Sequence, residues 1–209
     1  MKMTNRLSTR IGALTLTNPV ICASGEPVTT EAGIRAALEA GAAVVIAKSV
    51  NENPAGGRQL DRADYAWVGE SLFNRSGLSQ RETREWFAAI AAIDRDAVRT
   101  GQFVAASIVY GSADGAVEIA GMARSAGLRI FDLNVGAPHD SEATHGAIVQ
   151  GTDPVRLRAL VARVRSLVAA PRPSVAPHLR HERTVLLLPA SVLLTRAVTR
   201  RGPPVAVAR

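Results

Sequence analysis

The chain has 209 residues, of which 47% are hydrophobic and 21% are charged, a composition that allows a globular domain with a substantial core. The single cysteine, Cys22, excludes an internal disulfide framework and a zinc site built from several cysteines, and it favours a reducing, cytoplasmic location. The net charge of +7 does not by itself indicate a nucleic-acid partner, because residues 1–170 carry only +1 and residues 171–209 carry the remaining +6.

Between Pro19 and Ala170, short apolar runs alternate with amphipathic stretches, which is the pattern of parallel strands joined by helices. In chain order, the expected elements are a strand at 20–24, a helix from the cap Thr29 or Thr30 to Gly41, a strand at 43–48, a helix at 79–93, a strand at 103–109, a helix at 113–126 closed by Gly127, a strand at 130–135, and a helix from the cap Asp153 through Pro154 to 169. Residues 51–78 form a long connection, and connections of that length are usually functional.

A parallel chain of this kind can close as an eight-stranded barrel or open as a doubly wound sheet, and periodicity does not separate the two. The turn after the first strand, residues 23–27, lacks the Gly-x-Gly-x-x-Gly of a dinucleotide-binding open sheet. We therefore predict an α/β fold of the (β/α) TIM-barrel type. It is expected to be incomplete, with about four βα units.

The pattern ends at Pro171. Residues 171–209 hold six of the eleven prolines, seven arginines and one acidic residue, and proline cannot donate to a sheet ladder. The chain thus divides into a barrel segment, residues 1–170, and a basic Pro/Arg-rich tail, residues 171–209. The longest apolar run, Val185–Leu194, is too short to span a membrane, and Asn18-Pro19 interrupts the early apolar run, so we expect neither a membrane span nor a secretion signal.

The segment Ile130–His139 is the best candidate for a site. An apolar run leads to Asn134, and Gly136 and Pro138 then stop the strand and fix a turn. In an α/β barrel the ligand lies beyond the carboxyl ends of the strands, so polar side chains there are expected to contact substrate. The alternative is a turn in which the asparagine only caps local backbone.

Several motifs in this order resemble those of the dihydroorotate dehydrogenases, which are FMN-dependent TIM barrels of pyrimidine biosynthesis. The motifs are Asn18-Pro19 with Ala23-Ser24-Gly25, Lys48 at the end of the second strand, Asn74-Arg75-Ser76-Gly77-Leu78, and Leu133-Asn134-Val135-Gly136-Ala137-Pro138-His139. Each is weak alone, but their order and spacing match across about the first 150 residues. The resemblance implies an FMN oxidoreductase that acts on a CH–CH bond of a pyrimidine-like small molecule.

The resemblance also implies roles for individual residues. Ala23, Ser24 and Gly25 would lay backbone against the flavin, and small side chains permit that approach. Lys48 would face the ring, where a cation stabilises reduced FMN, although a solvated surface lysine is the alternative. The residues implied in substrate binding are Asn74, Gly77, Leu78, Asn134 and His139. No metal site is expected.

Two departures bear on catalysis. The position of the family's catalytic cysteine is Ala137 here, and an alanine cannot remove a proton. His139 or His145 could substitute as an acid or base, but a lone histidine near a turn is more often structural or solvated. The second departure is that nothing from Pro171 onward matches the later barrel half, which would supply a further lysine and the phosphate site.

We therefore hypothesise that the chain is a truncated or frame-shifted relative. A half-barrel exposes two sheet edges and the inner face, so two copies could pair as a homodimer, or a separate chain could complete the barrel.

Two other functions compete with the leading one. Asn134–Pro138 also resembles a motif of the tRNA-dihydrouridine synthases, for which the basic tail would hold RNA, but the motifs near Asn18 and Asn74 favour the first family. The other alternative is a non-catalytic remnant or binding module that keeps part of the ligand-facing surface.

Overall fold

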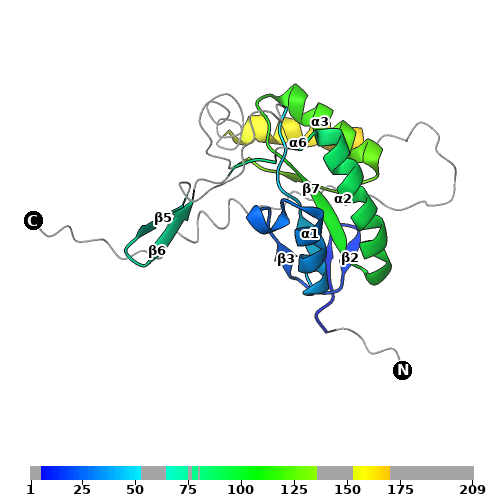
Figure 1. Cartoon of the computed structure of the whole chain (residues 1–209). Helices are drawn as coiled ribbons and strands as arrows, with labels where there is room; N and C mark the ends of the chain where they lie inside the picture. Colours follow the sequence, from blue (N-terminus) through cyan, green and yellow to red (C-terminus); the bar gives the residue numbers. More distant parts are fainter. Residues whose placement is uncertain (1–5, 53–64, 75–76, 80, 136–152, 170–209) are drawn as a thin grey trace, which may run out of the picture.

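The computed structural model describes residues 6–52, 65–74, 77–79, 81–135 and 153–169 (Figure 1). Its centre is a four-stranded sheet in the order β3-β4-β7-β8, in which every neighbouring pair is parallel. The strands are β3 (Ile21–Cys22), β4 (Val44–Ile46), β7 (Phe103–Ile108) and β8 (Ile130–Leu133). The predicted α/β class, with parallel strands joined by helices, is confirmed. The four strands are compatible with part of a TIM barrel, and closure into a barrel stays a prediction.

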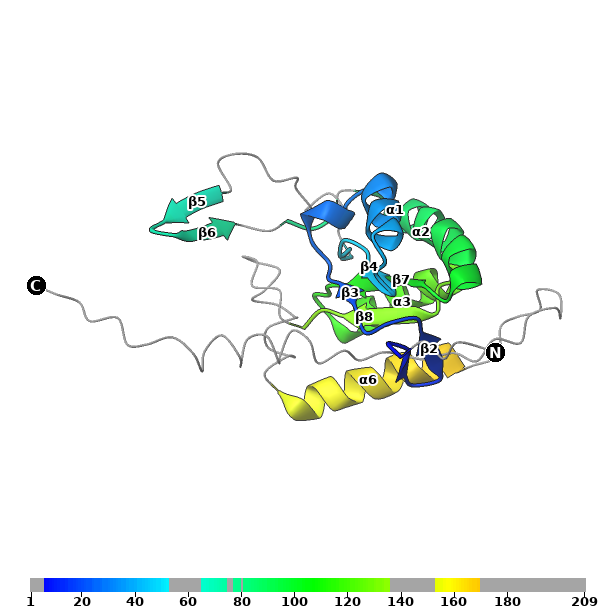
Figure 2. The ribbon, with the colours of Figure 1, turned by 90° about the horizontal axis from the view of Figure 1, so that it is seen from below.

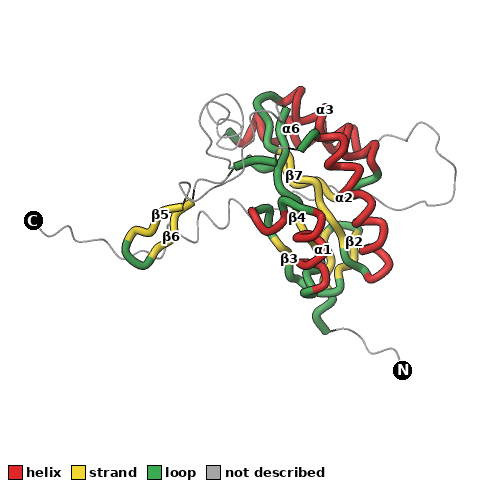
Figure 3. The backbone as a smooth tube through the Cα atoms, in the orientation of Figure 1, coloured by secondary structure: helices red, strands yellow, loops and turns green. Residues whose placement is uncertain are grey.

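The longer helices among the described residues are α1 (Glu31–Glu39), α2 (Thr83–Ala97), α3 (Ala113–Ala126) and α6 (Pro154–Ala169), and short 3-10 turns lie at Glu26–Val28 and Val98–Thr100 (Figure 3). The predicted terminal signals are found at α1, α3 and α6. The Thr30 side chain accepts from Gly33 N, and Asp153 Oδ1 accepts from Val155 N and Arg156 N. Gly127 ends α3 with φ of 108°, a left-handed conformation that glycine adopts without strain.

Alternating residues of the strands face two different cores. On one face, Val45, Val104 and Phe131 pack with apolar side chains of all four helices and form the helix-side core. On the other face, Ala105 and Ile130 pack with Leu14 and Leu16. The last two belong to a hairpin, β1 (Thr9–Ile11) and β2 (Leu14–Leu16), whose apolar side chains pack on this second face. In Figure 2 the hairpin lies on the side of the sheet away from α1 and α2.

Three parts of the fold differ from the sequence prediction. The hairpin of β1 and β2 was not expected, because strands of three residues are too short to show a period. The strand predicted at 20–24 is only Ile21–Cys22, and Cys22 is half-buried against the helix-side core. Helix α2 starts at Thr83 and extends to Ala97, whereas a helix at 79–93 was predicted. Residue 79 belongs to the end of the sheet, since Ser79 N donates to Ser49 O at 2.8 Å.

The long connection between β4 and α2 also contains structure. Strands β5 (Tyr65–Val68) and β6 (Ser71–Asn74) pair antiparallel around Gly69, whose φ is 58°. This hairpin projects from the body in both views (Figures 1 and 2). Trp67, Val68 and Leu72 are exposed on it. None of the described helices is long and apolar enough to cross a membrane, and the basic tail lies outside the described residues.

Candidate functional site

The carboxyl end of β4 contains an extra residue that shapes the site. Ala47 N donates to Ala105 O and Val50 N donates to Ser107 O, so three steps along this strand match two steps along β7. Such a mismatch is a β-bulge, which re-aims side chains. Ala47 and Val50 consequently both pack in the helix-side core, and Ser49 turns toward the opposite face.

Lys48 forms a buried ion pair at this bulge. Its Nζ lies 2.6 Å from Glu26 Oε1, and the two side chains are 4% and 28% exposed. The lysine backbone is fixed on both sides, because Lys48 N donates to Val28 O and Trp86 Nε1 donates to Lys48 O. The solvated-surface alternative for Lys48 is therefore wrong. Its partner Glu26 was missed by the sequence reasoning, although it directly follows the predicted flavin turn.

A chain of side-chain hydrogen bonds crosses the ends of the four strands. Ser24 Oγ lies 3.2 Å from Ser49 Oγ, and Ser49 Oγ lies 2.8 Å from Ser107 Oγ. Ser107 Oγ then donates to Asp132 Oδ2 at 2.7 Å. Ser107 and Asp132 share the face of Ala105 and Ile130, two residues earlier on their strands, so this face changes from apolar to polar toward the carboxyl end.

Asp132 ends this chain in a buried position. Burial raises the pKa of its carboxyl, and the Ser107 hydroxyl opposes that rise only in part. The sequence reasoning did not single out Ser49, Ser107 or Asp132. A polar residue within each apolar run was the available signal, but their contact depends on strand register.

The predicted flavin turn leaves room on its outer side. Ala23 is exposed and Ser24 is half-buried. Gly25 has extended backbone with φ of −170°, and an added Cβ would meet Pro27 Cδ at 3.6 Å, an ordinary contact. Packing within the described protein therefore does not require glycine at this position. The close approach of the Gly25 backbone to a flavin stays a prediction.

The implied substrate segments meet the same edge in part. Ser79 N donates to Ser49 O, which brings Gly77 and Leu78 to the end of β4, and Leu78 packs with Val109 beyond β7. Asn134 N donates to Ile108 O at 2.9 Å, which places Asn134 at the end of β8.

The structure does not test the remaining predicted site residues. The backbone of Asn74 ends β6, but its side chain is outside the described part of the chain. Ala137, His139 and His145 also lie outside the described residues, so their proposed roles remain predictions.

The described helices offer no ready phosphate site at their amino termini. Side chains of Thr30, Glu82 and Asp153 cap α1, α2 and α6. At α3, Glu52 accepts from Gly111 N and Ser112 N. An unoccupied helix amino terminus is a common anion site, and these are already satisfied by the protein. Within the described ranges, no group of three acidic, histidine or cysteine side chains could hold a metal ion.

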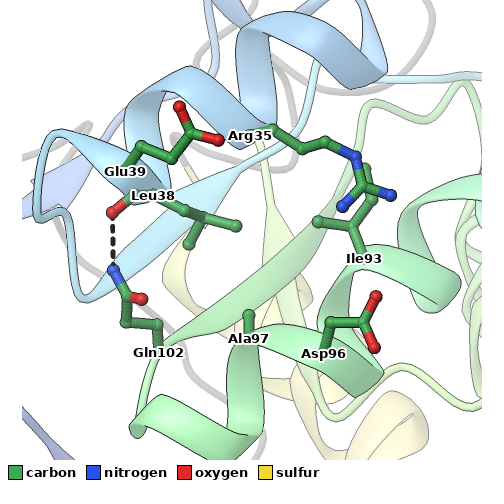
Figure 4. Close-up of a pocket in the computed structure, with 7 residues that line it drawn as sticks. All are labelled: Arg35, Leu38, Glu39, Ile93, Asp96, Ala97 and Gln102. Atoms are coloured by element: carbon green, nitrogen blue, oxygen red, sulfur yellow. Dashed lines mark hydrogen bonds between the residues drawn. The ribbon is translucent and has the colours of Figure 1, made fainter.

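An open pocket of about 210 Å³ lies at the opposite end of the sheet, between α1 and α2 (Figure 4). Gln102 closes one side by donating to Leu38 O and Ala42 O, both at 2.8 Å. The pocket is lined by Arg35, Leu38, Glu39, Ile93, Asp96, Ala97 and Gln102. None of these side chains belongs to the network at the carboxyl ends of the strands.

No family model matches the chain. The chain is 29% identical over 167 residues to the catalytic subunit of dihydroorotate dehydrogenase B (NAD(+)) from Methanocella arvoryzae. The alignment covers 79% of this chain and 52% of that protein, so the chain spans about half the length of the curated relative it matches. This distant similarity suggests the dihydroorotate dehydrogenase family.

Proposed function

We propose that the chain is a dihydroorotate dehydrogenase-like FMN oxidoreductase, with a site at the carboxyl ends of β3, β4, β7 and β8. The observation that carries the proposal is that Ser24, Lys48 and Asn134 lie at one edge of the sheet although they come from three separate segments. The distant relative supports the class of chemistry. The substrate proposed is a small molecule with a pyrimidine-like ring.

The side chains suit the ring of FMN. The Lys48 cation would stabilise negative charge on a reduced ring, and Glu26 holds the ammonium group in place. The outer side of Gly25 is not crowded by protein, and the nearby hydroxyls supply hydrogen-bond donors and acceptors. Bound FMN would supply the acceptor for a hydride. The phosphate would need residues other than the described helix amino termini.

The protein groups proposed to contact substrate are Asn134 and the segment of Gly77 and Leu78. An amide both donates and accepts, which suits the alternating carbonyl and N–H edge of a pyrimidine. Ala137 supplies no base, and this favours a second candidate function, a ring-binding protein without turnover. The two candidates share the site and differ in the proton-removal step.

The test is to purify the full chain with FMN and record its visible spectrum after gel filtration. Stoichiometric flavin absorption is expected, and Lys48→Met should weaken FMN binding by about tenfold. Lys2→Met is the matched control, since these are the two lysines of the chain. A colourless wild-type protein would overturn the flavin proposal.

A second measurement separates the two candidate functions. Dihydroorotate is added to the flavin-loaded chain without oxygen. Bleaching of the flavin absorption would support the oxidoreductase. Bound flavin that stays oxidised would support the non-catalytic binder.

A further inference from the structure

The chain of hydroxyls from Ser24 to Asp132 has two hydrogen-bonding arrangements. Either oxygen can be the donor in the Ser24–Ser49 contact and in the Ser49–Ser107 contact. A hydroxyl has one proton, so when one hydroxyl of the series reverses its bond, its neighbours reverse theirs. The direction of the whole series is therefore decided at its buried end, by Asp132.

An ionised Asp132 can only accept. Ser107 then donates to Asp132, Ser49 donates to Ser107, and Ser24 donates inward to Ser49. In this arrangement the half-buried Ser24 hydroxyl offers only an oxygen lone pair to a ligand at the carboxyl edge. The outer end of the series is an acceptor.

A protonated Asp132 can donate to Ser107. Ser107 then donates to Ser49, and Ser49 donates to Ser24, whose own proton is free to point outward. Ser49 N also donates to Ser24 Oγ at 3.2 Å, which holds the Ser24 oxygen in place in both arrangements. Protonation at the buried end thus makes the outer end a donor.

We propose that Asp132 and Ser107 are positioning residues that set whether Ser24 donates to or accepts from the ligand bound at the carboxyl ends of the strands. The identity of that ligand as FMN rests on the proposed function. The coupling between Asp132 and Ser24 does not, because it follows from hydrogen bonds within the protein.

Among the described residues, the surroundings of Asp132 supply no competing charge to this series. Burial raises the pKa of Asp132, and the hydrogen bond from the Ser107 hydroxyl opposes that rise. No charged side chain of the described residues contributes to the shift. The charged groups on neighbouring elements have other partners: Lys48 is paired with Glu26, and Arg129, just before β8, with Asp94. The titratable Tyr110 follows β7, and burial raises its pKa to about 12, so it does not ionise near neutral pH.

The coupling is tested by NMR on the full chain without ligand, with ¹³C in aspartate carboxyls and serine Cβ atoms. As pH is varied, the Ser24 and Ser49 signals should shift with the same midpoint as the Asp132 carboxyl. Ser107→Ala should leave Asp132 titrating but remove the response of Ser24. Asp114→Asn, at an exposed carboxyl paired with Arg163, is the control and should change neither. A Ser24 response that survives Ser107→Ala would overturn the proposal.

The second arm uses FMN. Its dissociation constant should change by about three- to tenfold across the Asp132 midpoint, the effect of one hydrogen bond. Asp132→Asn should fix it near the acid-limit value, because the amide donates to Ser107 as the protonated carboxyl does. Equal pH dependence in wild type and Asp132→Asn would overturn the ligand role. If FMN does not bind at any pH, the proposed function fails, while the serine signals still decide on the coupling.

Discussion

The two ends of the sheet each bury an aspartate, and the two differ in their partners. At the amino end, Asp94 accepts from Val104 N at 2.9 Å and lies 3.1 Å from Arg129 Nη1. At the carboxyl end, Asp132 accepts from the Ser107 hydroxyl at 2.7 Å. Burial raises the pKa of both carboxyls, but within the described part of the chain only Asp94 has a cation and a backbone N–H to oppose this rise.

This difference in partners indicates that Asp94 has a structural role, whereas Asp132 belongs to the candidate functional site. Asp94 joins α2, β7 and the start of β8, so its ion pair fixes the packing of three elements. Asp132 joins a series of hydroxyls that leads to a half-buried serine at the open edge. A buried carboxyl with few hydrogen bonds or cations to offset its lost hydration lowers the stability of the fold. Such groups are concentrated at functional sites.

The largest expected effect is at the amino end. Asp94→Ala leaves Arg129 without its partner, and breaking a buried pair in this way should lower the free energy of unfolding by about 3 kcal/mol. Urea denaturation measures the loss. Asp96→Ala, an exposed aspartate two residues along the same helix, is the control and should cost less than about 0.5 kcal/mol. Equal losses in both variants would show that the buried pair of Asp94 and Arg129 has no special structural role.

At the carboxyl end, the contribution of Asp132 to stability should depend on pH. Because the Asp132 pKa is raised in the folded protein, its contribution to stability is fully present below the pKa of the unfolded chain and is lost as pH rises through the folded pKa. The loss is about 1.4 kcal/mol for each unit of difference between the two pKa values. Asp132→Asn should remove this part of the pH dependence, measured by urea denaturation at several pH values. A steeper dependence in the variant would show that Asp132 is stabilising when ionised.

Gln102 should show a smaller, structural effect. Its amide donates to Leu38 O and Ala42 O at the pocket of the amino end. Gln102→Glu keeps the shape but cannot donate, so it should cost about 2 kcal/mol. Thermal unfolding measures the loss, and FMN affinity should stay unchanged. A loss of FMN affinity would connect the pocket to the ligand site.

The smallest effect concerns Tyr110, just beyond β7. Its side chain is fully buried, and its hydroxyl has no hydrogen-bond partner among the described residues. Tyr110→Phe removes an unsatisfied polar group and should raise the free energy of unfolding by about 1 kcal/mol. Urea denaturation provides the measurement. A destabilised variant would mean that the hydroxyl has a partner outside the described ranges.

The sequence was sufficient where the structure depends on local signals. The caps at Thr30 and Asp153 and the stop at Gly127 located three helices, because each acts within one turn of its own helix. Lys48 was placed at the edge of the sheet by its position after an apolar run.

The rest of the site depends on register between strands. The contact of Ser49 with Ser107 joins residues 58 positions apart, and it requires the bulge after β4. Periodicity along one strand contains no information on such an offset. The partner of Lys48 was missed for a related reason, since Glu26 reaches it from a short 3-10 turn after a different strand.

The most direct test of the proposed flavin site is to locate bound FMN on the protein. Backbone amide signals of the ¹⁵N-labelled full chain are followed by NMR while FMN is added. With a flavin site at the carboxyl ends of the strands, the signals of Gly25, Ser49 and Asn134 should shift, while those of Ala97 and Gln102 at the opposite pocket should not. Shifts confined to the pocket, or no shifts at saturating FMN, would contradict a flavin site at the carboxyl ends of the strands.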